Sequence, residues 1–253
     1  MKHISLFSGI GGIDLAAEWA GFTTILFVEK DPLCQKVLQK HWPGVPIIGD
    51  VKDVKGNETE GAITLITGGF PCQPFSTAGE RKGQADDRFL WPEMFRVISE
   101  VRPHWIVAEN VTGILSMGGI DVLSNLESCG YETTSFLIPA CSLGARHKRN
   151  RVFFVAHNNS QRGARTKGVS QGGGNLGNSR DTNHNHNEGR IQTKGEAEIQ
   201  NRFDCEPRVG RMVPRSANGV DRLRSLGNAV VPQQVYPILK AIADIENYEG
   251  EQR

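Results

Sequence analysis

The chain has 253 residues, of which 38% are hydrophobic and 23% are charged, and its formal net charge is +1. These values are typical of a globular protein with one large domain, or with one domain and a small addition. No apolar run reaches the length of about 18 residues that a transmembrane helix needs, and the N-terminus has no signal-peptide pattern. The five cysteines form no CxxC pair, and an odd count without a secretory signal indicates reduced thiols; we therefore expect a cytoplasmic protein without membrane contact.

Strand-like and helix-like patterns alternate over the first 157 residues. The extended apolar stretches, which begin at residues 3, 23, 63, 104 and 151, are HISLF, TTILFVE, ITLITGG, HWIVAEN and RVFFVAH. Helical spacing occurs between them in GIDLAAEWAGF, DPLCQKVLQKHW, PEMFRVISEVR and IDVLSNLESCG. This order predicts an α/β fold, with a mostly parallel, doubly wound sheet and helices on both faces. Ligands of such sheets bind at the carboxyl ends of the strands.

The alternation ends after residue 157, and a polar stretch follows. Residues 158–221 are rich in Asn, Gly and Arg and contain one aromatic residue, Phe203. Such a stretch buries too little apolar surface to fold alone. We therefore expect either a small recognition region that a partner orders or a disordered insert. A helical pattern returns in the second half of residues 222–249.

Charge is distributed unevenly along the chain. Residues 146–224 carry 16 Lys and Arg against 7 Asp and Glu, whereas the remainder carries 13 against 21. This local excess favours a site for a polyanion over an ordinary solvated basic surface.

A glycine-rich turn, LFSGIGG, lies between the first predicted strand and the first predicted helix. Gly9 and Gly11 allow a ligand to approach closely, although the full GxGxxG pattern is absent. Glu29 ends the second strand twenty residues beyond Gly9, where dinucleotide sites place the acid that holds ribose hydroxyls. Asp50 ends the extended run VPIIGD, where it is placed to meet an adenine amine. Each carboxylate alone is typical of a surface; together they favour a nucleoside cofactor.

The stretch TGGFPCQPFST places one cysteine, Cys72, between two prolines. Pro71 and Pro74 have a fixed φ, and they push the preceding Phe70 and Gln73 toward extended conformations. A cysteine that only fills core space needs no such rigid setting, so the loop indicates a positioned nucleophile.

Two further strand ends carry reactive side chains. In WIVAEN, Glu109 follows four apolar residues, so burial should raise the pKa of its carboxyl and favour proton sharing. Asn110 is equally suited to cap a helix. Arg149 and Arg151 occupy alternate positions at the start of the last predicted strand and so share one face. Two guanidinium groups on one face can bind a phosphate or a carbonyl oxygen; the alternative is a solvated edge of the sheet.

Taken in order, these motifs resemble those of the cytosine-C5 DNA methyltransferases of bacteria and phages. LFSGIGG is similar to the cofactor loop of that family, FPCQPFS to its Pro-Cys motif and ENV to its glutamate motif. RHKRNRVF is similar to its paired-arginine motif, and GNAVVPQ to the C-terminal element beside the cofactor. The resemblance extends from residue 4 to about residue 242. Two features depart from it: His147 stands where the family commonly has glutamine, and the variable region before GNAVVPQ is short.

The resemblance implies a domain organisation and a cofactor. Residues 1–157 with 222–253 would form a Rossmann-like catalytic and cofactor-binding domain, and residues 158–221 a small target-recognition region. The cofactor would be S-adenosylmethionine, with Glu29 on the ribose and Asp50 on the adenine. The other implied cofactor contacts are Phe7, Gly9, Gly11, Phe70 and Asn228.

The resemblance also implies a reaction, that of a DNA (cytosine-5-)-methyltransferase. Cys72 would attack C6 of a cytosine flipped out of duplex DNA, while Glu109 bonds N3 and the exocyclic amine. C5 would then take the methyl group, and loss of the C5 proton and of Cys72 would release 5-methylcytosine. Arg149 and Arg151 complete the implied catalytic set. The enzyme would serve in restriction–modification, or as an orphan or phage enzyme.

Partners follow from the same resemblance. We expect a monomer in a bacterial or phage-infected cell, without stable contact to a restriction endonuclease that acts on the same site. We expect no metal, because His184 and His186 have only Cys205 nearby as a further ligand.

Three other functions compete with this one. The same chemistry acts on RNA in some enzymes, and the motifs describe the reaction rather than the polymer. A silent cofactor-binding or DNA-binding module is disfavoured by the intact Cys72, Glu109 and arginines. A nucleotide-dependent oxidoreductase is disfavoured by the incomplete glycine pattern and the Pro-Cys loop.

Overall fold

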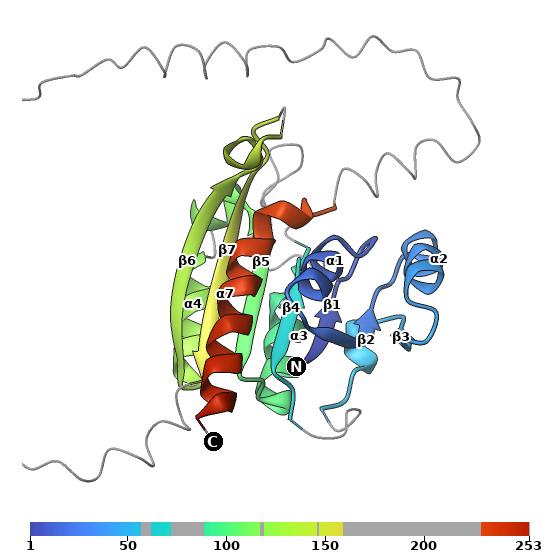
Figure 1. Cartoon of the computed structure of the whole chain (residues 1–253), viewed down its shortest axis with the longest axis horizontal. Coiled ribbons are helices and arrows are strands. Elements are labelled where there is room, and N and C mark those ends of the chain that lie inside the picture. Colours follow the sequence, from blue (N-terminus) through green and yellow to red (C-terminus); the bar gives the residue numbers. More distant parts are fainter. Residues whose placement is uncertain (57–61, 72–88, 117–118, 146, 159–228, 253) are drawn as a thin grey trace, which may run out of the picture.

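The computed structural model describes residues 1–56, 62–71, 89–116, 119–145, 147–158 and 229–252. In that part of the chain seven strands form one sheet, in the order β3-β2-β1-β4-β5-β7-β6 (Figure 1). β7 runs antiparallel to β5 and β6, and the other neighbouring pairs are parallel. The predicted α/β fold with a mostly parallel sheet is therefore confirmed. The strands are β1 (Lys2–Leu6), β2 (Thr23–Val28), β3 (Ile47–Ile48), β4 (Leu65–Gly68), β5 (Trp105–Val111), β6 (Tyr131–Pro139) and β7 (Asn150–Asn158).

Helices cover both faces of the sheet. α1 and α7 pack together on one face, α3 and α4 cover the other, and α2 lies beside β2 and β3 (Figure 1). No helix among the described residues combines the length and the hydropathy needed to cross a membrane. The helices are α1 (Gly12–Trp19), α2 (Pro32–His41), α3 (Trp91–Val101), α4 (Gly119–Ser128) and α7 (Pro232–Glu251), with the 3-10 turns η1 (Val51–Asp53), η4 (Thr112–Ser116) and η5 (Ala140–Leu143).

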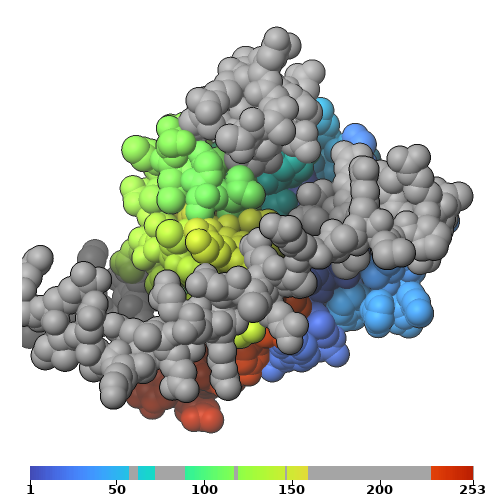
Figure 2. Space-filling model, turned by 90° about the horizontal axis from the view of Figure 1, so that it is seen from above, coloured from blue at the N-terminus to red at the C-terminus, as the bar shows by residue number. Residues whose placement is uncertain are grey.

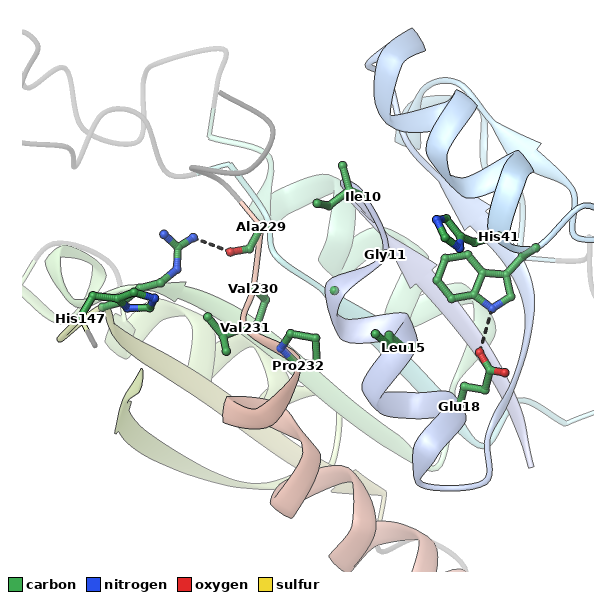
Figure 3. Close-up of a pocket in the computed structure, with 13 residues that line it drawn as sticks. Ile10, Gly11, Leu15, Glu18, His41, His147, Ala229, Val230, Val231 and Pro232 are labelled. Atoms are coloured by element: carbon green, nitrogen blue, oxygen red, sulfur yellow. Dashed lines mark hydrogen bonds between the residues drawn. The ribbon is translucent and has the colours of Figure 1, made fainter. Parts of the chain in front are cut away.

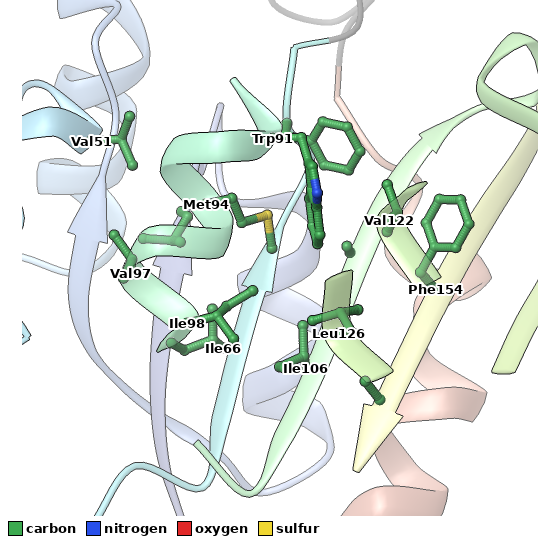
Figure 4. Packing of buried hydrophobic residues seen from close by; sticks show 14 of the residues in the cluster. Val51, Ile66, Trp91, Met94, Val97, Ile98, Ile106, Val122, Leu126 and Phe154 are labelled. Carbon is green, nitrogen blue, oxygen red and sulfur yellow. The ribbon is translucent and has the colours of Figure 1, made fainter. Parts of the chain in front are cut away.

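The central strands are apolar on both faces because both faces are covered. In β5, Ile106 and Ala108 point into the core under α3 and α4, whereas Trp105 and Val107 point into the core under α1 and α7. Figure 4 shows Ile106 packed near α3 and α4. This near-continuous apolar run is typical of buried parallel strands.

Local signals explain where the predicted helices begin. Asp31 caps α2, since its Oδ1 accepts a hydrogen bond from Leu33 N at 2.7 Å, and Pro32 occupies the first helical position. The last turn of α2 carries Lys40 and His41, which suit the negative end of a helix. The helix expected over residues 31–42 therefore forms with Asp31 as its cap.

Sequence analysis missed one strand, β6. In the described part of the sheet it is an edge strand that pairs with β7, and four consecutive residues, 134–137, are exposed. A strand with so little burial needs no clear alternation of apolar and polar residues, so its pattern was too weak to detect.

β7 carries the chain away from the carboxyl ends of the parallel strands. Its early residue Arg151 pairs with Val111 at the end of β5, and its late residue His157 pairs with Trp105 at the start of β5. The next described residue after Asn158 is Ala229. It lies again near the carboxyl ends of the parallel strands, where it accepts a hydrogen bond from the Arg149 guanidinium. The predicted recognition region, apart from Asn158, lies outside the described residues, and its boundaries stay a prediction.

A polar cluster is buried beneath α1. The His3 ring bridges the hydroxyls of Thr24 and Thr67, at 2.9 and 2.8 Å, and so ties β1 to β2 and β4. Asp14, in the first turn of α1, lies 3.9 Å from the same ring. Burial lowers the pKa of His3 to about 3 and raises the pKa of Asp14 to about 7, the latter against the effect of the Ser5 hydroxyl. His3 is therefore neutral, and Asp14 titrates near neutral pH.

Candidate active site

Four segments meet at the carboxyl ends of β1, β2, β4 and β5. They are the glycine loop (residues 7–12), Glu29, residues 69–71 and Glu109. Figure 2 looks down on this edge, with the N-terminal elements in blue on one side and the green and yellow elements on the other. A ligand site at this edge is the arrangement expected of a parallel α/β sheet.

The glycine loop turns sharply after β1. Phe7, Gly9 and Gly11 have positive φ angles of 53°, 57° and 87°. Ser8 N donates to Val28 O at 3.1 Å, so the loop folds over the end of β2. Phe7 and Gly9 line a cavity of about 720 Å³, here called the Glu29 cavity. Its walls also include Val28, Glu29, Asp31, Cys34, Asp50, Val51, Gly69, Pro71, Leu90 and Ala229.

Glu29 holds the glycine loop from within this cavity. One of its carboxylate oxygens accepts from Gly9 N at 2.7 Å, and the other accepts from Asp31 N at 2.7 Å. Each oxygen of a carboxylate has two lone pairs, so Glu29 keeps acceptor capacity for a ligand hydroxyl. Glu29 therefore has both a structural contact and a free acceptor face.

Asp50 supplies a second carboxylate to the cavity. Its Oδ1 caps η1 by accepting from Lys52 N at 3.1 Å, and its Oδ2 lies 3.1 Å from Lys30 Nζ. The Lys52 amide and then the Lys30 ammonium lower the pKa of Asp50, so it is ionised at neutral pH. Two carboxylate acceptors on one partly apolar cavity match the ribose hydroxyls and the exocyclic amine of a nucleoside.

Glu109 and Arg151 form a buried pair next to this cavity. Arg151 Nε lies 2.6 Å from Glu109 Oε1. Burial raises the pKa of the Glu109 carboxyl to about 7, although Arg151 and Arg149 lower it. The predicted direction is confirmed: the carboxyl holds a proton over part of the neutral range and is suited to proton sharing.

Residues 69–71 are fastened to the end of β5. Asn110 Nδ2 donates to Phe70 O at 3.0 Å. A Cβ atom on Gly69 would lie only 2.9 Å from Glu109 Oε2, so the backbone passes Glu109 with no room for a side chain. Phe70 is 2% exposed, and the centre of its ring lies 5.2 Å from that of the Trp91 ring. Its side chain belongs to the core rather than to the cavity wall. Phe70 thus contributes its carbonyl, not its ring, to the local structure.

Residues 229–234, which include the start of α7, pack against the glycine loop and Arg149. The Arg149 guanidinium donates to Ala229 O, and Gln234 Nε2 donates to Arg149 O at 2.9 Å. A Cβ atom on Gly12 would collide with Val230 O. The C-terminal element therefore lies beside the glycine loop, as the motif order implies.

A second cavity, of about 590 Å³, lies on the other side of the glycine loop (Figure 3). We call it the Trp42 cavity. Gly11 and Arg149 line this cavity and not the Glu29 cavity, which separates them from the predicted cofactor contacts. Its remaining walls are formed by Ile10, Gly12, Leu15, Glu18, His41, Trp42, His147 and residues 229–232.

Two predicted site residues, Cys72 and Asn228, lie outside the described residues. Their described neighbours are Pro71, which lines the Glu29 cavity, and Ala229, which lines both cavities. His184, His186 and Cys205 also lie outside. Among the residues that are described, no group of three or more His, Cys, Asp or Glu side chains could hold a metal.

Sequence reasoning missed His3, Trp42 and Gln234. His3 lies inside an apolar strand, Trp42 follows a helix, and only Gln234 sits next to a motif, GNAVVPQ. Their partners are 21, 24 and 85 residues away in the chain, so no local pattern could reveal them.

Residues 1–209 match the family of C-5 cytosine-specific DNA methylases. The chain belongs to this family.

Named methylases are similar to about three fifths of the chain. Type II methyltransferase M2.BsuMI of Bacillus subtilis is 37% identical over 165 residues, which cover 62% of this chain and 42% of that protein. M.AquIA of Picosynechococcus is 35% identical over 179 residues, covering 62% of this chain and 71% of that protein. The chain spans less than half the length of M2.BsuMI and of M.FnuDI.

Solved methylase structures share the fold. A prophage-encoded E. coli protein, described as a DNA modification methyltransferase, has a TM-score of 0.55 and 28% identity, over 64% of this chain and 48% of that one. Spodoptera frugiperda DNMT2 has a TM-score of 0.54 and 21% identity, over 62% of this chain and 50% of that one. At that identity the second likeness concerns the fold alone.

Proposed function

We propose that the protein is a DNA (cytosine-5-)-methyltransferase that methylates C5 of a cytosine in duplex DNA with S-adenosylmethionine. The observation that carries the proposal is the buried Glu109–Arg151 pair beside Gly69, where the chain enters the segment that contains Cys72. Membership of the methylase family and the Type II methyltransferase relatives support the same activity.

The Glu29 cavity is the proposed cofactor site. Glu29 accepts from the ribose hydroxyls with its remaining lone pairs, Asp50 accepts from the adenine amine, and Phe7 contributes apolar contact. Bound S-adenosylmethionine supplies an electrophilic methyl group. Pro71 and Gly69 border the same cavity, which brings the Pro-Cys segment to the cofactor.

The proposed chemistry begins at Cys72. Its thiolate attacks C6 of the cytosine and forms an S–C6 bond, which makes C5 nucleophilic. Glu109, whose pKa burial raises to about 7, shares its proton with N3 in its protonated form, while Arg151 holds the carboxyl in place. C5 takes the methyl group; loss of the C5 proton then breaks the S–C6 bond and frees the thiolate. C5 is hidden in the base stack, so the target base is flipped out.

Duplex DNA is the proposed substrate, and residues 158–221 are the proposed recognition region. Residues 146–224 carry 16 Lys and Arg against 7 Asp and Glu, an excess that suits a phosphate backbone. A monomeric state, a cytoplasmic location and a restriction endonuclease acting on the same site stay predictions.

The decisive test is covalent trapping on duplex DNA that contains 5-fluorocytosine. Fluorine cannot leave C5 as a proton does, so wild type should form a stable adduct in the presence of S-adenosylmethionine, and Cys72→Ser should form none. Cys72→Ser should still bind the cofactor, which separates lost chemistry from misfolding. An adduct that persists in Cys72→Ser would refute the assignment, and methyl transfer to tRNA but not to duplex DNA would replace the substrate.

A further inference from the structure

The glycine loop lies between two cavities, and its residues line both of them. On one side Gly9 and Glu29, joined by a 2.7 Å hydrogen bond, line the Glu29 cavity. On the other side Gly11 and Trp42 line the Trp42 cavity (Figure 3). A Cβ atom built on Gly11 would lie 2.5 and 2.7 Å from Cζ3 and Cη2 of Trp42, so the indole ring rests directly against the backbone of the loop.

Trp42 is anchored on three elements, two through its side chain and one through its backbone. Its indole N–H donates to Glu18 Oε2 of α1 at 3.2 Å. Its ring lies 5.4 Å from the Phe27 ring of β2, and its backbone N donates to Leu38 O at the end of α2 at 2.7 Å. An indole held at both its polar and its apolar end has one orientation, so it can act as a rigid support.

We propose that Trp42 is a positioning residue for cofactor binding: its ring supports Gly11 from behind and so fixes the face that Gly9 and Glu29 present to the cofactor. This inference rests on the proposed cofactor site in the Glu29 cavity. Of the two cavities, Trp42 lines the Trp42 cavity and not the Glu29 cavity.

The physical reason lies in the conformation of Gly11. At φ 87° and without a Cβ, Gly11 has no side chain to restrict it, so its position depends on its backbone hydrogen bonds with Ser8 O and Leu15 N and on packing against the indole. Removing the indole leaves space behind the loop, and the loop can then withdraw from Glu29. Binding sites lose affinity when the residues that support their contacts allow shifts of even a fraction of an ångström.

The experiment compares two tryptophans with the same kind of anchor. Trp105, at the start of β5, is 9% exposed, and its indole donates to Glu246 Oε1 at 2.9 Å. Trp42→Ala should raise the Kd for S-adenosylmethionine in calorimetry roughly tenfold, and Trp42→Phe should give an intermediate value. Trp105→Ala should lower the melting temperature at least as much and leave the Kd within about twofold of wild type.

Steady-state kinetics give a readout that a general loss of stability would not. The KM for S-adenosylmethionine should rise with the Kd, while kcat at saturating cofactor stays within about twofold of wild type. Equal Kd values for wild type and Trp42→Ala would overturn the inference. A wild-type protein that binds no S-adenosylmethionine at all would instead overturn the proposed function.

A double-mutant cycle tests the contact itself and still works if Trp42→Ala folds poorly, because Trp42→Phe can replace it. Gly11→Ala should weaken cofactor binding strongly in wild type, where the new methyl group collides with the indole. The same change should cost several-fold less once the indole is removed, since only backbone strain and the looser contact with Leu38 Cδ2, at 3.2 Å, remain. Fully additive effects would show that Trp42 does not act through Gly11.

Discussion

Arg151 Nε lies 2.6 Å from Glu109 Oε1, and the two side chains are only 13% and 9% exposed. The guanidinium lowers the pKa of the carboxyl, but burial has the larger effect and raises it to about 7. The Glu109 carboxyl therefore gains or loses its proton near neutral pH.

The pH dependence of methyl transfer should report this pair. If protonated Glu109 bonds the cytosine, the single-turnover rate should fall as pH rises through about 7. Arg151→Met removes a charge that lowers the pKa of Glu109, so the midpoint should move to higher pH, whatever happens to the maximal rate. Arg151→Lys keeps the charge and should leave the midpoint closer to that of wild type. A midpoint that stays fixed or moves downward in Arg151→Met would contradict this role.

Glu29 should be the most sensitive contact in the cofactor cavity. Glu29→Ala removes an acceptor that serves both the loop amide and the ligand, and should weaken S-adenosylmethionine binding roughly tenfold or more. Glu29→Gln should also weaken binding, because an amide NH₂ cannot accept from Gly9 N or Asp31 N. Isothermal calorimetry measures both, with Glu93→Gln, in a partly exposed ion pair with Arg96, as the control. Unchanged affinity in Glu29→Ala would remove Glu29 from the site.

Asp14 should make stability depend on pH. Its folded pKa of about 7 lies above its usual value of 3.8, so the folded state binds the extra proton. Wild type should therefore lose stability from Asp14 as pH rises from about 4 to about 7, with no further change above. Asp14→Asn removes this penalty, and its unfolding free energy relative to wild type should increase over that window by up to a few kcal/mol.

Urea unfolding at several pH values measures this difference. His3, whose folded pKa of about 3 lies below its usual 6.5, makes the stability of both proteins fall as pH drops below about 6.5, and this contribution cancels in the comparison. Asp53→Asn, at an exposed position, is the matched control and should show a flat difference. A flat difference for Asp14→Asn would mean that the Asp14 carboxyl is ionised at little cost.

The basic segment should dominate the salt dependence of DNA binding. Contacts to phosphates give a slope of roughly −0.9 in log K against log salt for each phosphate neutralised. A variant that neutralises Arg190, Arg202, Arg208 and Arg211 should flatten this slope and leave the affinity for S-adenosylmethionine unchanged. Fluorescence anisotropy across a salt series measures the slope. If the variant keeps the wild-type slope and methylates the same sites, the segment is a passive insert.

Patterns with a short period and a buried environment could be predicted from the sequence. The five predicted strands have apolar cores covered by helices, and the rise in the pKa of Glu109 follows from the four apolar residues before it. The glycine loop and Glu29 were likewise predictable, because both lie at strand ends with recognisable local composition.

Contacts between distant parts of the chain could not be predicted. Arg149 was expected to suit a phosphate or a carbonyl oxygen; its guanidinium bonds the carbonyl of Ala229, a partner 80 residues away that no local pattern identifies. Gly11 was expected beside the cofactor, but its backbone packs against Trp42. Neighbouring residues of the same loop line different cavities, Gly9 the Glu29 cavity and Gly11 the Trp42 cavity. β6 was not predicted, because an exposed edge strand needs no clear alternation of apolar and polar residues.

The antiparallel course of β7 limits how short the protein can become. The eight steps from Asn150 to Asn158, at about 3.3 Å each, place Asn158 roughly 26 Å from the end of β7 near which Ala229 contacts Arg149. A chain spans at most about 3.6 Å per residue, so any replacement for residues 159–228 needs at least about eight residues to close this gap, and more to pass around the surface. A direct fusion of Asn158 to Ala229 would have to pull apart the last strand or the first turn of α7. When residues 159–228 are shortened step by step, the protein should stop folding abruptly at a linker length that is fixed by the length of β7. The sequence of the residues removed should not matter.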